Sequence, residues 1–330
     1  MVPNLSEPAV RSDPPSSPER ASASSQNHLQ FVLITAARNE EAFIGKTLDS
    51  VVAQTVLPER WMIIDDGSTD RTAEVVAAYA ATRHWIELVR LPHRHERHFA
   101  GKVHAFNAGL DRVRSLHYDV VGNLDADVSL EPDHFEFLLR KFGEDPKLGV
   151  AGTVYTQPRF DSMSDSFEGE ESVAGPLQLF RSECFRDIGG YVPNRLGGVD
   201  WIAVTTARMK GWKTRTFKER RFHHHRSMGT AERSDVQASY DYGVKDYFIG
   251  NSPLWEVLRC TYRMRRSPVA GIALLAGFGW AALRRIDRPV SPALMAFHRR
   301  EQMLKLRRIV KAVVTLRRIE KFHLPSEGGS

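Results

Sequence analysis

The pattern of hydrophobic and polar positions predicts strands that alternate with helices over the first part of the chain. Short apolar runs predict buried strands, and apolar residues spaced three or four apart predict helices. Strands are expected at 29–37, 61–70, 86–91 and 119–128, with helices between them at 39–54, 72–81 and 103–113. This alternation is typical of βαβ units, so we expect an α/β fold with a mostly parallel sheet.

The ends of the chain differ from this pattern. Residues 1–28 are rich in Ser and Pro and have no apolar periodicity, which predicts a disordered tail. The uncharged run Pro268–Leu283 and the long basic stretch 291–322 predict helices. We therefore expect a tail at 1–28, an α/β domain at 29–230 and a basic, membrane-associated helical region at 231–330.

Composition excludes several classes of protein. With 330 residues, 42% hydrophobic and 26% charged, the chain is neither fully disordered nor collagen-like. Two cysteines, Cys184 and Cys260, give no disulfide framework and favour a reducing compartment. The net charge of +6 is unevenly distributed: residues 257–330 hold 16 Lys and Arg against 4 Asp and Glu. No nucleic-acid-binding motif accompanies this excess, so we expect no nucleic-acid partner.

Polar residues follow three of the predicted strands. Glu40 lies just beyond the first strand, Asp65 and Asp66 end the second, and Asp125 and Asp127 follow the fourth. Ligands of parallel α/β sheets bind at the carboxyl ends of the strands, so these carboxylates are expected to share one rim. The alternative for any single carboxylate is a turn or a helix cap.

The pair Asp125 and Asp127 suggests a metal site. Two carboxylates separated by one residue after a buried strand suit Mg²⁺ or Mn²⁺, which prefer carboxylate, water and phosphate oxygens. Such a cation would neutralise a diphosphate leaving group. The motif is short, and its position at a strand end is what makes it informative.

Residues 31–226 resemble the family 2 glycosyltransferases of the GT-A fold. The motifs that carry the resemblance, in the family's order, are TAARNEE, VVAQTVLPERWMIIDDGSTD, GKVHAFNAGL, NLDADV, LFRSECFRDIGGY and VDWIAVTTARMKGW. The resemblance implies inverting transfer of a sugar from a nucleotide-sugar donor, with Mn²⁺ or Mg²⁺ as cofactor. The implied partners are a UDP- or GDP-sugar and a saccharide or lipid-linked acceptor of the cell-envelope or exopolysaccharide type.

The resemblance also implies roles for individual residues. The positions expected to contact the donor are Thr35, Ala36, Glu40, Asp65, Asp66, Lys102, Asn107 and Asp125. The positions expected to hold the metal are Asp127, Asp125 and His225. His225 belongs to a run of three histidines that would alternate sides in an extended strand, so at most two of them can face the site. A solvated basic loop is the alternative for this run.

Asp200 is the residue expected to act as general base. The family has a Glu-Asp pair at this point, and here Val199 replaces the Glu. Asp200 would take the proton of an acceptor hydroxyl, and the alternative is a helix cap. The Gln-x-x-Arg-Trp element of processive members is absent from the sequence, which predicts a single addition of sugar.

The basic C-terminal segment suggests a membrane surface. Pro268–Leu283 is slightly shorter than a spanning helix and has arginines on both sides, which favours an interfacial or re-entrant segment over a crossing. A buried helix is the alternative, and 291–322 could equally pack on another helix. We expect residues 257–322 to associate with the membrane, peripherally or monotopically, on its cytoplasmic inner face.

Two other functions remain open from the sequence. A nucleotidyltransferase could use a similar nucleotide-binding sheet, although the loop after the first strand is a poor phosphate clamp. A non-catalytic membrane-associated scaffold would explain the loss of the Glu at Val199.

Overall fold

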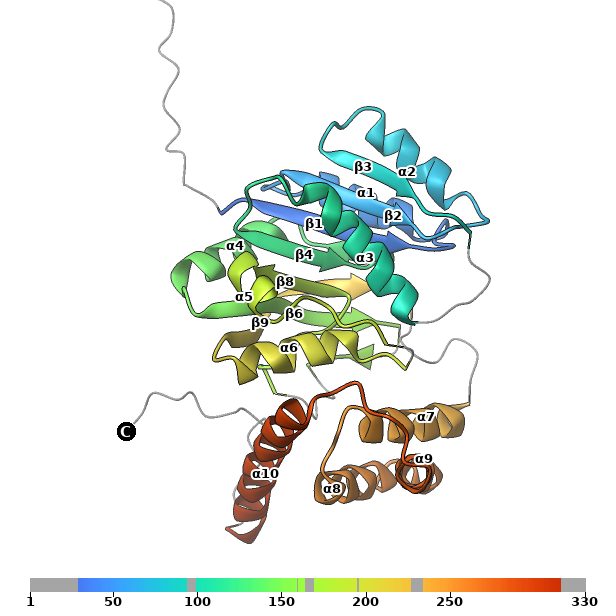
Figure 1. Cartoon of the computed structure of the whole chain (residues 1–330), viewed down its shortest axis with the longest axis vertical. Helices are drawn as coiled ribbons and strands as arrows, with labels where there is room; N and C mark the ends of the chain where they lie inside the picture. Colours follow the sequence, from blue (N-terminus) through green and yellow to red (C-terminus); the bar gives the residue numbers. More distant parts are fainter. Residues whose placement is uncertain are drawn as a thin grey trace, which may run out of the picture.

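The computed structural model describes residues 29–93, 99–158, 160–163, 169–194, 196–226 and 234–315. The predicted tail at 1–28 and the end of the basic helix beyond residue 315 lie outside the described residues. Figure 1 shows an α/β body with a group of helices, α7 to α10, below it.

One sheet runs through the α/β body in the order β3-β2-β1-β4-β8-β6-β9-β5, with β7 paired to β6. The strands are β1 (Phe31–Ala37), β2 (Arg60–Asp65), β3 (Ile86–Arg90), β4 (Val120–Leu124), β5 (Val128–Leu130), β6 (Leu148–Gln157), β7 (Phe160–Asp161), β8 (Leu177–Arg181) and β9 (Lys213–His224). Strands β3, β2, β1 and β4 are parallel, β8 is antiparallel to its neighbours, and β9 is parallel to β6. The predicted α/β fold is confirmed, and the parallel strands share one carboxyl edge.

Helices cover both faces of the sheet, which explains the continuous apolar runs of the strands. One face packs against α1 (Ile44–Val52), α2 (Thr72–Ala80) and α4 (His134–Glu144). The other packs against α3 (Phe99–Val113), α5 (Ser182–Asp187) and α6 (Val199–Met209). Because successive strand residues point to opposite faces, Leu33 joins the first core and Ile34 the second.

The C-terminal helices are α7 (Asp235–Phe248), α8 (Pro253–Met264), α9 (Pro268–Leu283) and α10 (Pro292–Val314). Helices α8, α9 and α10 each begin at a Ser-Pro pair, which suits an N-cap followed by the first helical position. The side chains of Ser267 and Ser291 accept backbone N–H groups there. Helix α9 has the bounds predicted from the sequence. Within the described part of the chain, no helix is both long and apolar enough to cross a membrane.

Ion pairs join α10 to the α/β body. The Arg208 guanidinium on α6 donates to both carboxylate oxygens of Glu301, at 2.8 and 3.0 Å. Lys305 pairs with Glu171, which precedes β8. These largely buried contacts fix the helical region against the face of the body that carries α6.

Candidate active site

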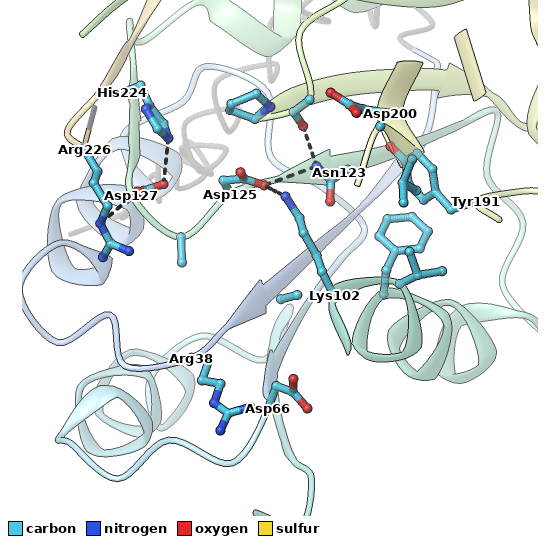
Figure 2. Close-up of a pocket in the computed structure, with 18 of the residues that line it drawn as sticks. Arg38, Asp66, Lys102, Asn123, Asp125, Asp127, Tyr191, Asp200, His224 and Arg226 are labelled. Atoms are coloured by element: carbon cyan, nitrogen blue, oxygen red, sulfur yellow. Dashed lines mark hydrogen bonds and ion pairs between the residues drawn. The ribbon is translucent and has the colours of Figure 1, made fainter. Parts of the chain in front are cut away.

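A cavity of about 840 Å³ lies where the carboxyl ends of β1, β2 and β4 meet (Figure 2). Its charged and amide-bearing lining residues are Arg38, Glu40, Asp66, Lys102, Asn123, Asp125, Asp127, Asp200, His224, Arg226, Asp241 and Lys245. The polar ends of the strands therefore converge on one space, as expected for a parallel sheet.

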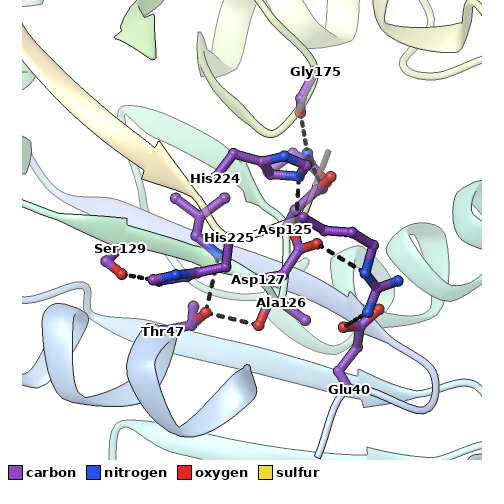
Figure 3. A network of polar contacts seen from close by, with 12 residues as sticks. Glu40, Thr47, Asp125, Ala126, Asp127, Ser129, Gly175, His224 and His225 are labelled. Carbon is purple, nitrogen blue, oxygen red and sulfur yellow. Dashed lines mark hydrogen bonds and ion pairs between the residues drawn. The ribbon is translucent and has the colours of Figure 1, made fainter. Parts of the chain in front are cut away.

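The turn between β4 and β5 presents Asp125 and Asp127 to this cavity, and its backbone is firmly held. The hydroxyl of Thr47 on α1 donates to Ala126 O at 2.7 Å and accepts from Val128 N–H at 3.1 Å (Figure 3). His225 N–H donates to Asp127 O at 2.9 Å. The two carboxylates are thus positioned before any ligand binds.

Asp125, Asp127 and His224 form a group that fits a divalent cation. Each offers a ligand atom, and these atoms lie within 4.8 Å of one another. His224 Nε2 lies 3.2 Å from Asp127 Oδ1. His224 Nδ1 is buried and has no hydrogen-bond partner among the described residues. Two carboxylates and an imidazole suit Mn²⁺ well, and Mg²⁺ through the carboxylates.

His225, expected as one of the metal ligands, does not face the two carboxylates, whereas His224 does. Strand β9 pairs with β5 so that His224 points to the carboxylates. His225 points to the other side, where its Nε2 hydrogen-bonds with the Ser129 hydroxyl and its ring stacks on Phe43 at 6.0 Å. The alternation of side chains along the strand is the physical reason.

Charges of opposite sign surround Asp127. Arg226 donates to Glu40 at 2.6 Å. It also lies 3.8 Å from Asp127 Oδ2 (Figure 2). Burial raises the pKa of Asp127, but the His224 hydrogen bond and the charges of His224 and Arg226 outweigh it and lower this pKa. Burial also lowers the pKa of His224, and Asp127 reverses that effect and raises it. Asp127 is therefore held as a carboxylate.

Glu40 titrates differently from its neighbour Asp127. Burial raises the pKa of Glu40 to about 7, with Arg226 opposing this shift and the charges of Asp127 and Asp125 adding to it. Its contact with Arg226 places Glu40 beside Asp127 and Asp125.

Lys102 and Asn123 hold Asp125 from the other side. The Lys102 ammonium on α3 lies 2.5 Å from Asp125 Oδ1, and the amide of Asn123 donates to the same oxygen at 3.4 Å. The Asn123 amide also donates to Gly175 O at 2.8 Å, which ties β4 to the loop before β8. The Lys102 ammonium therefore lines the cavity beside Asp125, where it can meet a phosphate group.

Asp200 lies across the cavity from the Asp127 group (Figure 2). It sits in the first turn of α6, whose N-cap is Gly198 with a left-handed φ of 76° and no side-chain cap. Helix capping therefore does not account for Asp200. A Cβ added at Gly175 would lie 2.6 Å from Asp200 Oδ2, so the glycine leaves room for this carboxylate.

Three residues expected to contact the donor do not line the cavity. The hydroxyl of Thr35 is buried and accepts a hydrogen bond from the Trp61 indole at 3.0 Å. The Asp65 side chain, 1% exposed, accepts from Ser68 N–H and pairs with Arg90. Asn107 lies on α3 outside the lining. The expected donor residues that do line the cavity are Ala36, Glu40, Asp66, Lys102 and Asp125.

Other lining residues had not been expected from the sequence. Tyr191 and Asn123 lie within the motifs LFRSECFRDIGGY and NLDADV, but their residue types alone do not indicate a role in the site. Tyr242 and Lys245 come from α7, whose sequence carries no motif, and reach the cavity only because the helix packs over it. Tertiary packing is the only signal for these two residues.

A second cavity of about 700 Å³ adjoins the first. Gly175, Asp200, Tyr242 and Lys245 line both cavities, so Asp200 stands at their junction. The second cavity continues between the α/β body and helices α8, α9 and α10.

Known proteins share part of this sequence. The chain is 33% identical over 148 residues to the poly-β-1,6-N-acetyl-D-glucosamine synthase of Staphylococcus aureus (strain COL), covering 45% of this chain and 31% of that protein. It is 32% identical over 186 residues to the 4,4'-diaponeurosporenoate glycosyltransferase of S. aureus (strain bovine RF122 / ET3-1), covering 50% of this chain and 47% of that protein. The chain thus spans less than half the length of these curated relatives.

Solved structures share the fold over most of the chain. The mannosyltransferase PcManGT of Pyrobaculum calidifontis matches with a TM-score of 0.53 and 19% identity, covering 88% of this chain and 84% of that one. S. aureus TarS 1-349 matches with a TM-score of 0.51 and 13% identity, covering 87% and 82%. Residues 32–164 match the family model described as glycosyl transferase family 2. With the sequence relatives, this match shows that residues 32–164 are similar to glycosyl transferase family 2.

Proposed function

We propose that the protein transfers one sugar, with inversion, from a nucleotide-sugar donor to an acceptor hydroxyl, with a divalent metal as cofactor. The observation that carries this proposal is the single cavity that joins the Asp125–Asp127–His224 group to Asp200. The match of residues 32–164 to the family model favours sugar transfer over nucleotidyl transfer. The group Asp125, Asp127 and His224 favours an enzyme over a scaffold.

The donor would lie along the first cavity with its nucleoside near Ala36 and Asp66. Two structural neighbours support this class of ligand, since PcManGT was solved with GDP-Man and Mn²⁺ and TarS 1-349 with UDP-GlcNAc. Lys102 and Arg226 lie where a diphosphate would reach the centre of the cavity. A UDP- or GDP-sugar, in which nucleoside, diphosphate and sugar follow one another, fits this arrangement of residues.

Asp125, Asp127 and His224 would hold the cation, Mn²⁺ or Mg²⁺. When bound, the cation neutralises the charge of the diphosphate leaving group. Arg226 and Lys102 would position the diphosphate. Thr47 fixes the turn that carries Asp125 and Asp127.

Asp200 would act as the general base. Its carboxylate takes the proton of the acceptor hydroxyl as that oxygen forms a bond to the anomeric carbon. The bond from the anomeric carbon to the diphosphate oxygen breaks on the opposite face, which inverts the configuration. The acceptor would enter through the second cavity, because Asp200 stands at the junction of the two. Tyr242 and Tyr262 line this cavity and supply aromatic side chains that suit a saccharide.

The test uses purified full-length protein and a panel of UDP-Glc, UDP-GlcNAc and GDP-Man, with and without Mn²⁺. We expect one donor to raise the melting temperature only with metal, and to be hydrolysed slowly in the absence of acceptor. Asp127→Ala should lose the metal-dependent shift, whereas Asp200→Asn should keep the shift and lose turnover. Turnover by Asp200→Asn at the wild-type rate would remove Asp200 from its role, and a metal shift unchanged in Asp127→Ala would remove the metal site.

We also propose that residues 257–322 attach the protein peripherally or monotopically to the inner face of the membrane. The net charge of residues 257–330 is +12 and that of the remainder is −6, which supports attraction of this region to anionic lipid. A lipid-linked acceptor would then be available at the same surface.

A further inference from the structure

Helix α9 has two faces of different accessibility, although all sixteen of its residues are uncharged. The buried positions, which include Leu274, Gly277 and Phe278, face the other helices. The large exposed residues form what we call the α9 stripe: Val269, Ile272, Leu275, Trp280 and Leu283. At about 100° per residue these five positions fall within an arc of about 140°. Their side chains are exposed by 43% to 86%, so a continuous apolar strip faces outward.

The packing of α9 limits how a membrane can meet it. Its sixteen residues span about 24 Å, less than the roughly 30 Å of a bilayer core. On the inner side its backbone is in close contact with α7: a Cβ at Gly277 would overlap the carbonyl of Tyr240, and a Cβ at Gly243 would overlap that of Leu274. Only the α9 stripe remains available, which suits a helix that lies in the plane of the interface.

Exposed arginines stand at both ends of the stripe. Arg265 and Arg266 precede Pro268, and Arg284 and Arg285 follow Leu283. A helix lying in the interface brings both pairs to the level of the lipid phosphates, whereas a crossing helix would place the pairs on opposite sides. One exposed acidic residue, Asp287, follows the second pair and leaves the local excess positive.

Helix α8 extends the same kind of surface. Its Leu254 and Val257 are 65% and 54% exposed. Figure 1 shows α8 and α9 below the α/β body, on the side away from β3, with α10 extending still farther in the same direction. A surface that approaches from this side reaches the C-terminal helices before the α/β body.

We propose that the α9 stripe docks flat on an anionic phospholipid bilayer, with its apolar side chains below the headgroups and the flanking arginines on lipid phosphates. This inference rests on the proposed membrane association of residues 257–322 and names the face responsible. It does not depend on sugar transfer.

The test is flotation of the full-length protein with vesicles of phosphatidylcholine alone or mixed equally with phosphatidylglycerol. We expect the wild type to float with the anionic vesicles and much less with the neutral ones. The double variant I272D/L275D should reduce the bound fraction more than about tenfold, because it places two carboxylates in the apolar layer. The matched control L57D/V192D changes two residues of similar exposure on the α/β body and should bind as the wild type does.

The possible outcomes separate membrane association of the protein from the choice of the α9 stripe as the docking face. If the wild type floats and I272D/L275D floats equally well, the membrane association stands and the α9 stripe is not its surface. If the wild type does not float with anionic vesicles, both the association and the docking face are wrong. A wild type that is dimeric by light scattering, with I272D/L275D monomeric and neither bound to vesicles, would assign the stripe to a second copy and also overturn the proposal.

Discussion

Gly277 allows α7 and α9 to approach closely, and its replacement by alanine should be costly. A Cβ at this position would overlap the Tyr240 carbonyl oxygen and lie 2.9 Å from its carbonyl carbon. The obstacle is backbone, so the helices must move apart by about 1 Å rather than a side chain turning away. Leu274 and Phe278 are buried in the same helix and would lose contacts in that movement.

The magnitude follows from two opposing contributions. Overpacking of this kind costs about 1–3 kcal/mol, and alanine in a helix returns about 0.8–1 kcal/mol relative to glycine. Gly279, two residues along the same helix, is the matched control because a Cβ there meets nothing within 4 Å. Gly279→Ala should therefore stabilise the protein by about 0.5–1 kcal/mol. Because the alanine gain is common to both variants, they should differ by roughly 1–3 kcal/mol, the overpacking cost, with Gly277→Ala the less stable.

The assay is thermal unfolding of both variants side by side. For a chain of this size, 1 kcal/mol corresponds to about 2–4 °C, so the two melting temperatures should differ by roughly 2–12 °C. Because α7 also carries Tyr242 and Lys245 of the candidate site, Gly277→Ala should lower turnover more than Gly279→Ala does. Equal melting temperatures would refute the close approach of the two helices.

Three further predictions concern the site and its supports. Gly175→Ala should lower turnover about 10–100-fold with little change in donor affinity, because its Cβ displaces the Asp200 carboxylate, as steady-state kinetics would show. Glu301→Ala should destabilise by about 3–5 kcal/mol in urea unfolding, since it leaves the largely buried Arg208 without its carboxylate. Burial, followed by the charge of Asp246, raises the pKa of Glu256 to about 7, so its contribution to stability is complete below about pH 4.5 and is lost as the pH rises through 7. Glu256→Gln should therefore gain up to about 3 kcal/mol relative to the wild type between pH 4.5 and pH 8.

Controls for these variants lie elsewhere in the same chain. Gly143→Ala adds a Cβ that meets nothing within 4 Å and should leave turnover unchanged. Arg140→Ala removes an exposed pair with Glu144 and should cost less than about 1 kcal/mol. A Gly175→Ala enzyme as fast as the wild type, a Glu301→Ala loss as small as that of Arg140→Ala, or a pH-independent effect of Glu256→Gln would each contradict the corresponding argument.

The fold and the rim of the site follow from the sequence because they depend on strong local patterns. The β1 and β4 runs and the exact bounds of α9 come from apolar residues with clear periodicity and clear stops. Which of two adjacent side chains of a strand faces the site is harder to predict from the sequence. Asp65 and His225 were expected in the site but do not line the cavity, whereas Asp66, which was also expected, and His224 line it. Both differences have one cause: adjacent residues face opposite sides, and composition does not say which side is which.

Residues that reach the site from a helix distant in the sequence cannot be recognised from a local pattern. Nothing in the α7 sequence indicates that Tyr242 and Lys245 meet the strand ends, because that contact depends on how α7 packs over them. The glycines that permit this packing are ordinary helix glycines until the facing carbonyls are known. Residues of this kind can be identified only from the tertiary structure.

The basic residues of the C-terminal region lie in two different environments. Lys305 pairs with Glu171, and Arg259 with Asp246, in contacts that are largely shielded from water. The arginines that flank α9, such as Arg284, are exposed. Salt screens exposed charges strongly and buried pairs weakly. High salt should therefore release the protein from anionic vesicles while its melting temperature stays nearly constant, and a parallel loss of both would mean that the same charges hold the fold and the membrane.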